Sequence, residues 1–151
     1  MGDKNYFIVS SDDVYTTKGN IGPANKLVIP FIEATGSHHV TMGKTTWGAN
    51  AYEPKEAHDC EEMYYITKGS CYIWLDNTKY LMKEGDFVFI PKGCSHKLRI
   101  KTAPFQQIWI HTELGDKEWM DLHFGKEKGQ RVIDRIVSSI NKNKRKPIQN
   151  S

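Results

Sequence analysis

The chain has 151 residues, of which 38% are hydrophobic and 11% aromatic, enough for one globular domain and too many for a disordered segment. Three cysteines without a CxxC pair argue against a disulfide framework and against a zinc–thiolate site. The formal net charge is +3, and no apolar run is long enough to span a bilayer.

Short runs of β-branched and aromatic residues recur along most of the chain. The predicted strands are Tyr6–Ser10, Lys26–Glu33, His39–Trp47, Met63–Thr67, Ser70–Leu75, Lys79–Met82, Phe87–Ile90, His96–Ile100 and Phe105–Thr112. Turn residues between them, such as Lys68–Gly69 and Ala103–Pro104, separate neighbouring strands. This spacing predicts an all-β sandwich or jelly-roll barrel rather than βαβ units, and the lack of an internal repeat predicts one barrel.

The pattern changes from strand to helix after Gly115. Apolar residues recur at helical spacing in a helix of about Glu127–Asn141, namely Val132, Ile133, Ile136, Val137 and Ile140. We expect this stripe to pack on the outside of the barrel, with a dimer contact as the alternative. The predicted organisation is a barrel over residues 1–114, a helical extension over 115–142 and a disordered tail over 143–151.

Two stretches of the chain contain the candidate chemistry, Glu56–Gly69 and Gly85–His96. Because alternate residues of a strand face one side, Glu56 and His58 point the same way, as do Glu62 and Tyr64. With His96 on a neighbouring strand, two imidazoles and two carboxylates would surround one point. Oxygen and nitrogen ligands without thiolate suit one divalent transition metal, which is Fe, Mn, Ni, Co or Zn.

These stretches resemble the two motifs of the cupin superfamily, G(x)5HxH(x)3–4E(x)6G and G(x)5PxG(x)2H(x)3N. The matching residues are His58, Glu62 and Gly69 in the first motif, and Gly85, Pro91, Gly93 and His96 in the second. The resemblance implies a single, RmlC-like cupin double-stranded β-helix, here followed by a C-terminal α-helix. It also implies a metal site that contains His58, Glu62 and His96.

The chain departs from the cupin motifs at two positions, where Glu56 replaces the first histidine and Ile100 replaces the final asparagine. The Glu56-x-His58 pair resembles the ExH metal site of ureidoglycine aminohydrolases, so Glu56 remains in the predicted ligand set. Glu53 and Glu61 are alternative fourth donors, and a site with only three protein ligands is the remaining alternative.

Tyr64 carries a second resemblance, to the cupin dimethylsulfoniopropionate lyases, whose motif is HxHxxxExYxxxxG. In those enzymes the tyrosine matched by Tyr64 is the base of a β-elimination. Strand alternation also places Tyr64 beside the metal, where a cation stabilises the phenolate and lowers the pKa of the phenol. Tyr64 is therefore the predicted catalytic acid or base, and the alternative is a hydrogen-bond donor to metal-bound water.

Four residues are predicted to bind substrate. Gln107, Trp109 and His111 share one face of the last strand and line the pocket if that face points inward; the opposite orientation is left open. Tyr52 lies at the barrel mouth before the ligands, where a residue forms a lid, a substrate wall or an interface.

The predicted function is a metal-dependent enzyme that acts on a small polar metabolite by proton abstraction, of lyase or isomerase type. The first alternative is an Fe(II)-dependent dioxygenase. The second is a non-catalytic cupin that binds or senses a small ligand, because one fold hosts many functions.

The C-terminal region is basic, since residues 126–151 hold eight Lys and Arg residues against Glu127 and Asp134. Residues 141–151 contain no aromatic side chain for base stacking, so we expect a solvated tail and no nucleic-acid partner. The first residues lack a basic segment followed by an apolar stretch, which predicts a cytoplasmic protein without a membrane partner. A homodimer is the expected assembly.

Overall fold

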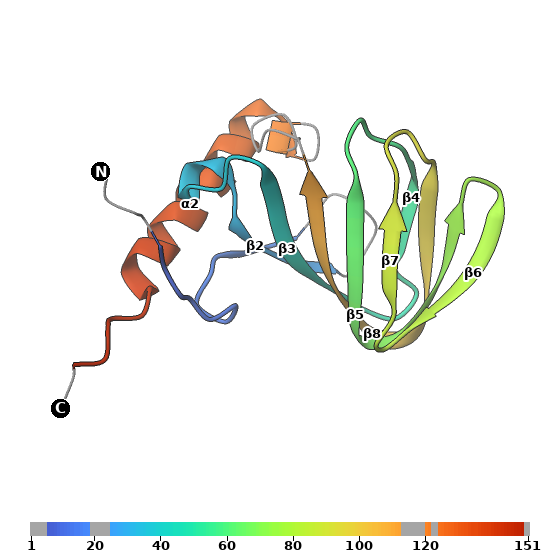
Figure 1. The fold of residues 1–151 in the computed structure, drawn as a ribbon, viewed down its shortest axis with the longest axis horizontal. Helices are drawn as coiled ribbons and strands as arrows, with labels where there is room; N and C mark the ends of the chain where they lie inside the picture. The colour runs from blue at the N-terminus through green and yellow to red at the C-terminus, as the bar shows by residue number, and fades with distance from the viewer. Residues whose placement is uncertain (1–5, 19–24, 113–119, 122–123, 150–151) are drawn as a thin grey trace.

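In the computed structural model, which describes residues 6–18, 25–112, 120–121 and 124–149, antiparallel strands are followed by one long helix (Figure 1). The strands are β1 (Thr16–Thr17), β2 (Asn25–Phe31), β3 (Val40–Trp47), β4 (Tyr52–Glu56), β5 (Glu62–Leu75), β6 (Thr78–Lys83), β7 (Phe87–Ile90) and β8 (His96–Thr112). A short 3-10 helix, η1 (Glu33–Thr35), follows β2, and α2 (Lys126–Asn143) ends the fold. The predicted all-β jelly-roll barrel with a C-terminal helix is confirmed.

The sheet folds back on itself because β5 and β8 pair with each other on both sides of a bend. The first half of β5 pairs with β7, and the second half of β8 pairs with β3. Strand β3 pairs in turn with β2, and β2 pairs with β1. We call this part the large layer. The second half of β5 pairs with β6, and the first half of β8 pairs with β4. These four strand segments form the small layer.

The bend explains why four of the predicted strands are two continuous strands in the structure. Gly69 has a positive φ of 70°, and a β-carbon there would lie against the carbonyl oxygens of Thr102 and Pro104. The pairing register shifts between Ile66 and Cys71, as expected for a bulged strand. Gly69 and Pro104 were therefore wrongly predicted as turns: they mark bends within β5 and β8.

Two further strand predictions differ from the structure. The segment Tyr6–Ser10 is not a strand, and its Ile8 carbonyl accepts a hydrogen bond of 2.8 Å from the Arg145 amide that follows α2. Strand β4 was missed because Pro54 and its charged neighbours are unusual in a central strand; β4 pairs only with β8 and tolerates them at the edge.

Helix α2 packs on the barrel through the predicted apolar stripe, in which Val132, Ile133, Ile136 and Ile140 are buried. These residues belong to the same apolar core as Ile29 of β2. The predicted packing on the outside of the barrel is confirmed, so the stripe gives no argument for a dimer. Among the described residues, no helix is both long and apolar enough to cross a membrane. The predicted domain boundary at residues 114–115 lies outside the described residues.

Candidate metal centre

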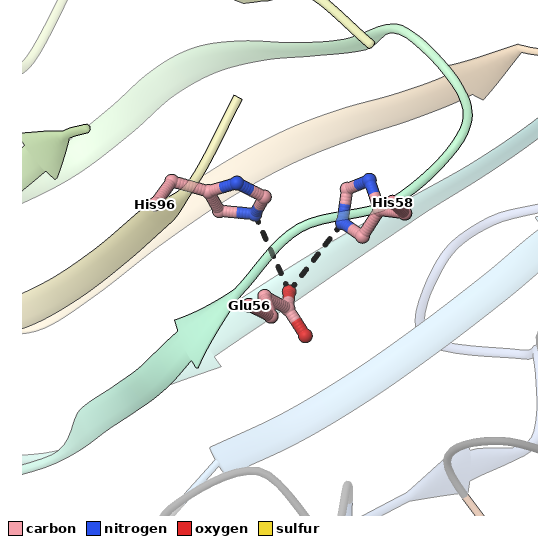
Figure 2. Close-up of side chains that lie close together, drawn as sticks. All are labelled: Glu56, His58 and His96. Carbon is pink, nitrogen blue, oxygen red and sulfur yellow. Dashed lines mark ion pairs between the residues drawn. The ribbon is translucent and has the colours of Figure 1, made fainter. Parts of the chain in front are cut away.

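The two layers bring two pairs of cross-strand neighbours together inside the barrel. Glu56 on β4 lies opposite His96 on β8 in the small layer. Glu62 on β5 lies opposite His111 on β8 in the large layer. His58 comes from the loop between β4 and β5, and its carbonyl accepts a 2.9 Å hydrogen bond from the Gly93 amide. Figure 2 shows the Glu56 carboxylate between the rings of His58 and His96.

Four side chains direct one atom each toward a common point. Glu56 Oε1 lies 3.6 Å from His58 Nε2 and 3.4 Å from His96 Nε2. Glu62 Oε2 lies 3.4 Å and 3.2 Å from the same two nitrogens. Ligands about 2.1 Å from a transition metal stand roughly 3.0–3.4 Å apart at the corners of an octahedron or tetrahedron. The distances from each carboxylate oxygen to the two nitrogens therefore fit one metal ion.

The unsatisfied polar atoms of the site support this fit. His58 Nε2, His96 Nε2 and Glu62 Oε2 are buried and form no hydrogen bond. A buried polar atom left without a partner costs about 1–3 kcal/mol, and such atoms are few in native proteins. A single cation would satisfy all three. The structure thus brings together Glu56, His58, Glu62 and His96, the four predicted ligands.

The surrounding residues orient the two imidazoles. His96 Nδ1 lies 3.1 Å from the Cys94 carbonyl oxygen, so in the neutral ring it donates a hydrogen bond there and leaves Nε2 free as a ligand. His58 Nδ1 lies 3.5 Å from Cys60 Sγ. Cys60 is buried and is not part of a disulfide.

Opposite charges shift the pKa values of the buried groups strongly. Burial acts to raise the pKa of Glu62, but the charge and close polar contact of His111, followed by those of His96, lower it to about 2. Burial acts to lower the pKa of His96, but close polar contacts with Glu56 and Glu62 and the charges of Glu62 and Glu53 raise it to about 11. Without a metal ion, the His96 imidazolium supplies the positive charge of the site.

The structure also distinguishes Glu56 from the two alternative carboxylate donors, Glu53 and Glu61. Glu53 Oε1 lies 3.9 Å from His96 Nε2, farther than Glu56 Oε1. Burial and then the charges of Glu56 and Glu62 raise the pKa of Glu53, which favours the protonated carboxyl in the metal-free site. Among the described residues, two groups of side chains could hold a metal ion, Glu56–His58–His96 and His58–Glu62–His111, and Glu61 belongs to neither.

His111 has a contact that the motif comparison did not reveal. Its Nε2 lies 2.7 Å from Glu62 Oε1, whereas Glu62 Oε2 is the oxygen near His58 and His96. Substrate binding by His111 stays a prediction, and the structure shows its ring in contact with Glu62. The signal in the sequence was strand alternation, because His111 continues the inward face that contains Gln107 and Trp109.

The inward orientation of that face is confirmed, since Gln107, Trp109 and His111 are all buried. The Trp109 ring lies against Gly43, where a β-carbon would collide with it, and its Nε1 donates a 2.9 Å hydrogen bond to Thr45 Oγ1. Gln107 Oε1 is buried without a hydrogen bond. Tyr52, in contrast, is 51% exposed beside Arg99, on the face of β4 opposite to the cluster, so the structure does not bring it to the site.

Tyr64 lies on the same inward face of β5 as Glu62 and is buried, and its hydroxyl has no hydrogen-bond partner. Burial, followed by the charges of Glu62, Glu53 and Glu56, raises the pKa of Tyr64 well above its ordinary value. The phenol is therefore protonated in the metal-free site. The lowered pKa expected from the sequence applies only once a cation offsets the carboxylate charges.

Comparisons with known proteins agree with this fold. Residues 44–111 match the model of the family described as "Cupin domain". A 38-residue segment is 45% identical to an uncharacterized protein, MJ1618, of Methanocaldococcus jannaschii, and covers 25% of this chain and 30% of that protein. The chain thus matches less than a third of that relative's length.

Two solved structures extend the likeness over most of the chain. An RmlC-like cupin of Shewanella frigidimarina superposes with a TM-score of 0.62 at 18% identity, over 76% of this chain and 96% of that one. The polyketide cyclase RemF of Streptomyces resistomycificus superposes with a TM-score of 0.64 at 14% identity, over 87% and 99%. At these identities the likeness concerns the fold alone. The match of residues 44–111 to the cupin domain model, the fold and both motifs support the assignment of this barrel to the cupin superfamily.

Proposed function

We propose that this chain is a metal-dependent enzyme that abstracts a proton from a small polar metabolite, in a lyase or isomerase reaction. The supporting observation is the convergence of the buried, unsatisfied atoms His58 Nε2, His96 Nε2 and Glu62 Oε2, on the inward face that also contains Tyr64. A bound Fe, Mn, Ni, Co or Zn ion would supply Lewis-acid polarisation of a substrate oxygen.

In this proposal the four ligands hold the ion and Tyr64 moves the proton. Glu56 has the most exposed side chain of the four proposed ligands, at 25%, so substrate approaches on its side. Tyr64, as phenolate, accepts a proton from a substrate carbon next to the polarised group. The electron pair left on that carbon either forms a double bond as a β-substituent departs, or takes up a proton elsewhere in the isomer.

Two buried side chains next to Tyr64 are suited to position the substrate. Gln107 Oε1 has no hydrogen bond, so it accepts one from a substrate hydroxyl or amine. Trp109 is fixed by its bond to Thr45 and forms an apolar wall. Small substrates with one polar and one apolar end fit this arrangement.

A second candidate function is supported by the ligand types. Two imidazoles and a carboxylate, here His58, His96 and Glu62, are the ligand set of non-haem Fe(II) oxygenases. In that case the protein consumes O₂ when iron and substrate are present.

The metal site is tested by elemental analysis of protein expressed in medium with mixed metals. We expect about one ion per chain in the wild type and a loss of bound metal in His96→Ala and Glu62→Ala. Glu61→Gln is the matched control, because it removes a neighbouring carboxylate that lies outside the cluster. Equal metal content in all four proteins would contradict the proposal.

The reaction class is tested on a panel of β-substituted and α-hydroxy carboxylic acids with the metal-loaded protein. We expect Tyr64→Phe to keep its metal and to lose roughly 10²–10⁴-fold in turnover. Oxygen uptake that depends on Fe(II) would favour the dioxygenase instead. Ligand binding without turnover, unchanged in His96→Ala, would favour a sensor.

A further inference from the structure

The outer surface of the small layer is basic. Alternation along its strands turns Cys71, Ile73, Met82, Leu98 and Ile100 toward the core. The residues between them face outward, and five of these are cations: Lys79 and Lys83 on β6, and Lys97, Arg99 and Lys101 on β8. We call this surface the basic sheet face.

Two aromatic side chains of β5 lie between these cations. In the pairing register, Trp74 lies between Lys79 on one side and Lys97 on the other, and Tyr72 lies beside Arg99. Tyr72 and Trp74 are half-buried, and their ring centroids are 6.5 Å apart. The flat surface therefore has a pair of rings at its centre and positive charge on both flanks.

The cations of the basic sheet face cover the rings rather than pair with acids. Lys79 Nζ lies 4.1 Å from the Tyr72 ring centroid and 5.2 Å from that of Trp74, and Lys97 Nζ lies 4.8 Å from the Trp74 centroid. Within the described part of the chain, none of the five cations forms an ion pair with a carboxylate. Five neighbouring positive charges without a counterion repel each other and attract a polyanion.

We infer that the basic sheet face binds single-stranded nucleic acid. Bases stack on Tyr72 and Trp74, and the lysines they displace from the rings reach the phosphates. Aromatic residues on the surface of a four-stranded sheet, flanked by basic side chains, are a general mode of single-strand recognition. A flat sheet offers no element that enters the groove of a duplex. A neutral sugar would require carboxylate or amide partners for its hydroxyls, and the basic sheet face presents cations instead.

This inference is independent of the proposed metal site, because the basic sheet face is on the opposite side of the small layer from the cluster. The expectation of no nucleic-acid partner was derived from the C-terminal tail, which lacks aromatic residues. Helix α2 and the tail lie at the other end of the molecule from β6 (Figure 1). The two basic regions can therefore be tested separately.

The test measures fluorescence anisotropy of a labelled oligouridylate of about 12 nucleotides with the full-length protein, a length suited to single-strand sites. We expect binding that weakens with salt, with a slope of about −3.5 in log K against log salt if all five cations contact phosphates. Trp74→Ala should weaken binding roughly 5- to 100-fold, and Trp74→Phe should keep most of it. Lys97→Gln/Lys101→Gln should make the salt slope shallower by about 1.4.

The matched control is Lys126→Gln/Lys142→Gln, which removes the same charge from exposed positions on α2. This control should leave the affinity within about twofold of wild type, and a duplex of the same length should bind more weakly. An equal loss in the control, no loss in Trp74→Ala, or no binding at low salt would overturn the inference. Tighter binding to polygalacturonate or to phosphatidylserine vesicles, lost in the Lys97/Lys101 variant, would assign the face to another polyanion and also overturn it.

Discussion

Individual residues show how the barrel keeps charge inside an apolar core. His96 is 1% exposed and lies within 3.4 Å of carboxylate oxygens of Glu56 and Glu62, so its proton is held where a metal ion fits. The His111 ring contacts the other oxygen of Glu62 at 2.7 Å. The metal-free site thus holds His96 in buried ion pairs with two carboxylates, which stabilise the fold only while both partners of each pair are charged.

The pKa values predict how the stability of the metal-free protein depends on pH. His96 is raised from 6.5 to about 11, so its contribution is complete below pH 6.5 and is lost as the pH rises toward 11. Glu62 is lowered from 4.5 to about 2, so its contribution is complete above pH 4.5 and is lost as the pH falls toward 2. Urea unfolding of the chelator-treated protein should give a free energy of unfolding that declines between pH 6.5 and 9.5. The same decline in His96→Gln would contradict this assignment, and the exposed His38→Gln is the control.

The contact between His111 and Glu62 predicts an effect on metal affinity. His111→Phe removes the hydrogen bond that orients Glu62, so we expect metal affinity to fall about 10- to 100-fold while the fold is kept. Competition with a chromophoric chelator measures this change, and His39→Phe, at an exposed position, is the control. Equal affinities would show that Glu62 does not depend on His111.

At the scale of elements, alternation in the sequence identified the inward face of β5, with Glu62 and Tyr64. It also grouped Gln107, Trp109 and His111 on one face of β8 but left the orientation of that face open. It could not show that β5 and β8 each continue through a bend, because glycine and proline produce the same local signal in a turn and in a bulge. It also could not place His111 against Glu62, since that contact depends on the cross-strand register. The missed strand β4 is an edge strand, and Pro54 interrupts the run of residues that would have predicted it as a strand.

The bend itself gives a prediction about stability. In Gly69→Ala the new methyl group meets the carbonyl oxygens of Thr102 and Pro104 at a positive φ, so we expect a loss of about 1–3 kcal/mol. Gly36→Ala is the matched control, since Gly36 also has a positive φ but has open space around it. Denaturant unfolding should show a clearly larger loss in the free energy of unfolding for Gly69→Ala than for Gly36→Ala. Equal losses would mean that the close approach of the two strands at Gly69 does not add to the cost of the substitution.

At the scale of the whole molecule, the chain presents two contrasting surfaces. The basic sheet face is on the small layer, whereas Phe87 and Phe89 on β7, with Tyr65 beside them, expose aromatic side chains on the large layer. Exposed apolar patches of this kind mark contact surfaces, and a patch that pairs with its own copy forms a symmetric dimer. The motifs in the sequence indicated the metal site but not these surfaces, because they arise from residues on separate strands.

The homodimer expected from the sequence remains a prediction, now assigned to this aromatic patch rather than to α2. Light scattering after size exclusion should give twice the chain mass for the wild type and the single chain mass for Phe87→Ser/Phe89→Ser. Tyr52→Ser, which removes an exposed aromatic residue of β4, should leave the mass unchanged. A monomeric wild-type protein would refute the prediction.

The central claim is that residues from both layers bind one metal ion inside the barrel. It is tested most directly by an anomalous difference map from crystals of protein reconstituted with Mn(II) or Zn(II). We predict one peak per chain, about 2.0–2.2 Å from His58 Nε2, His96 Nε2 and a carboxylate oxygen of Glu62, with Glu56 at the fourth position. A map without a peak at this point, or with the two imidazoles turned apart, would contradict it.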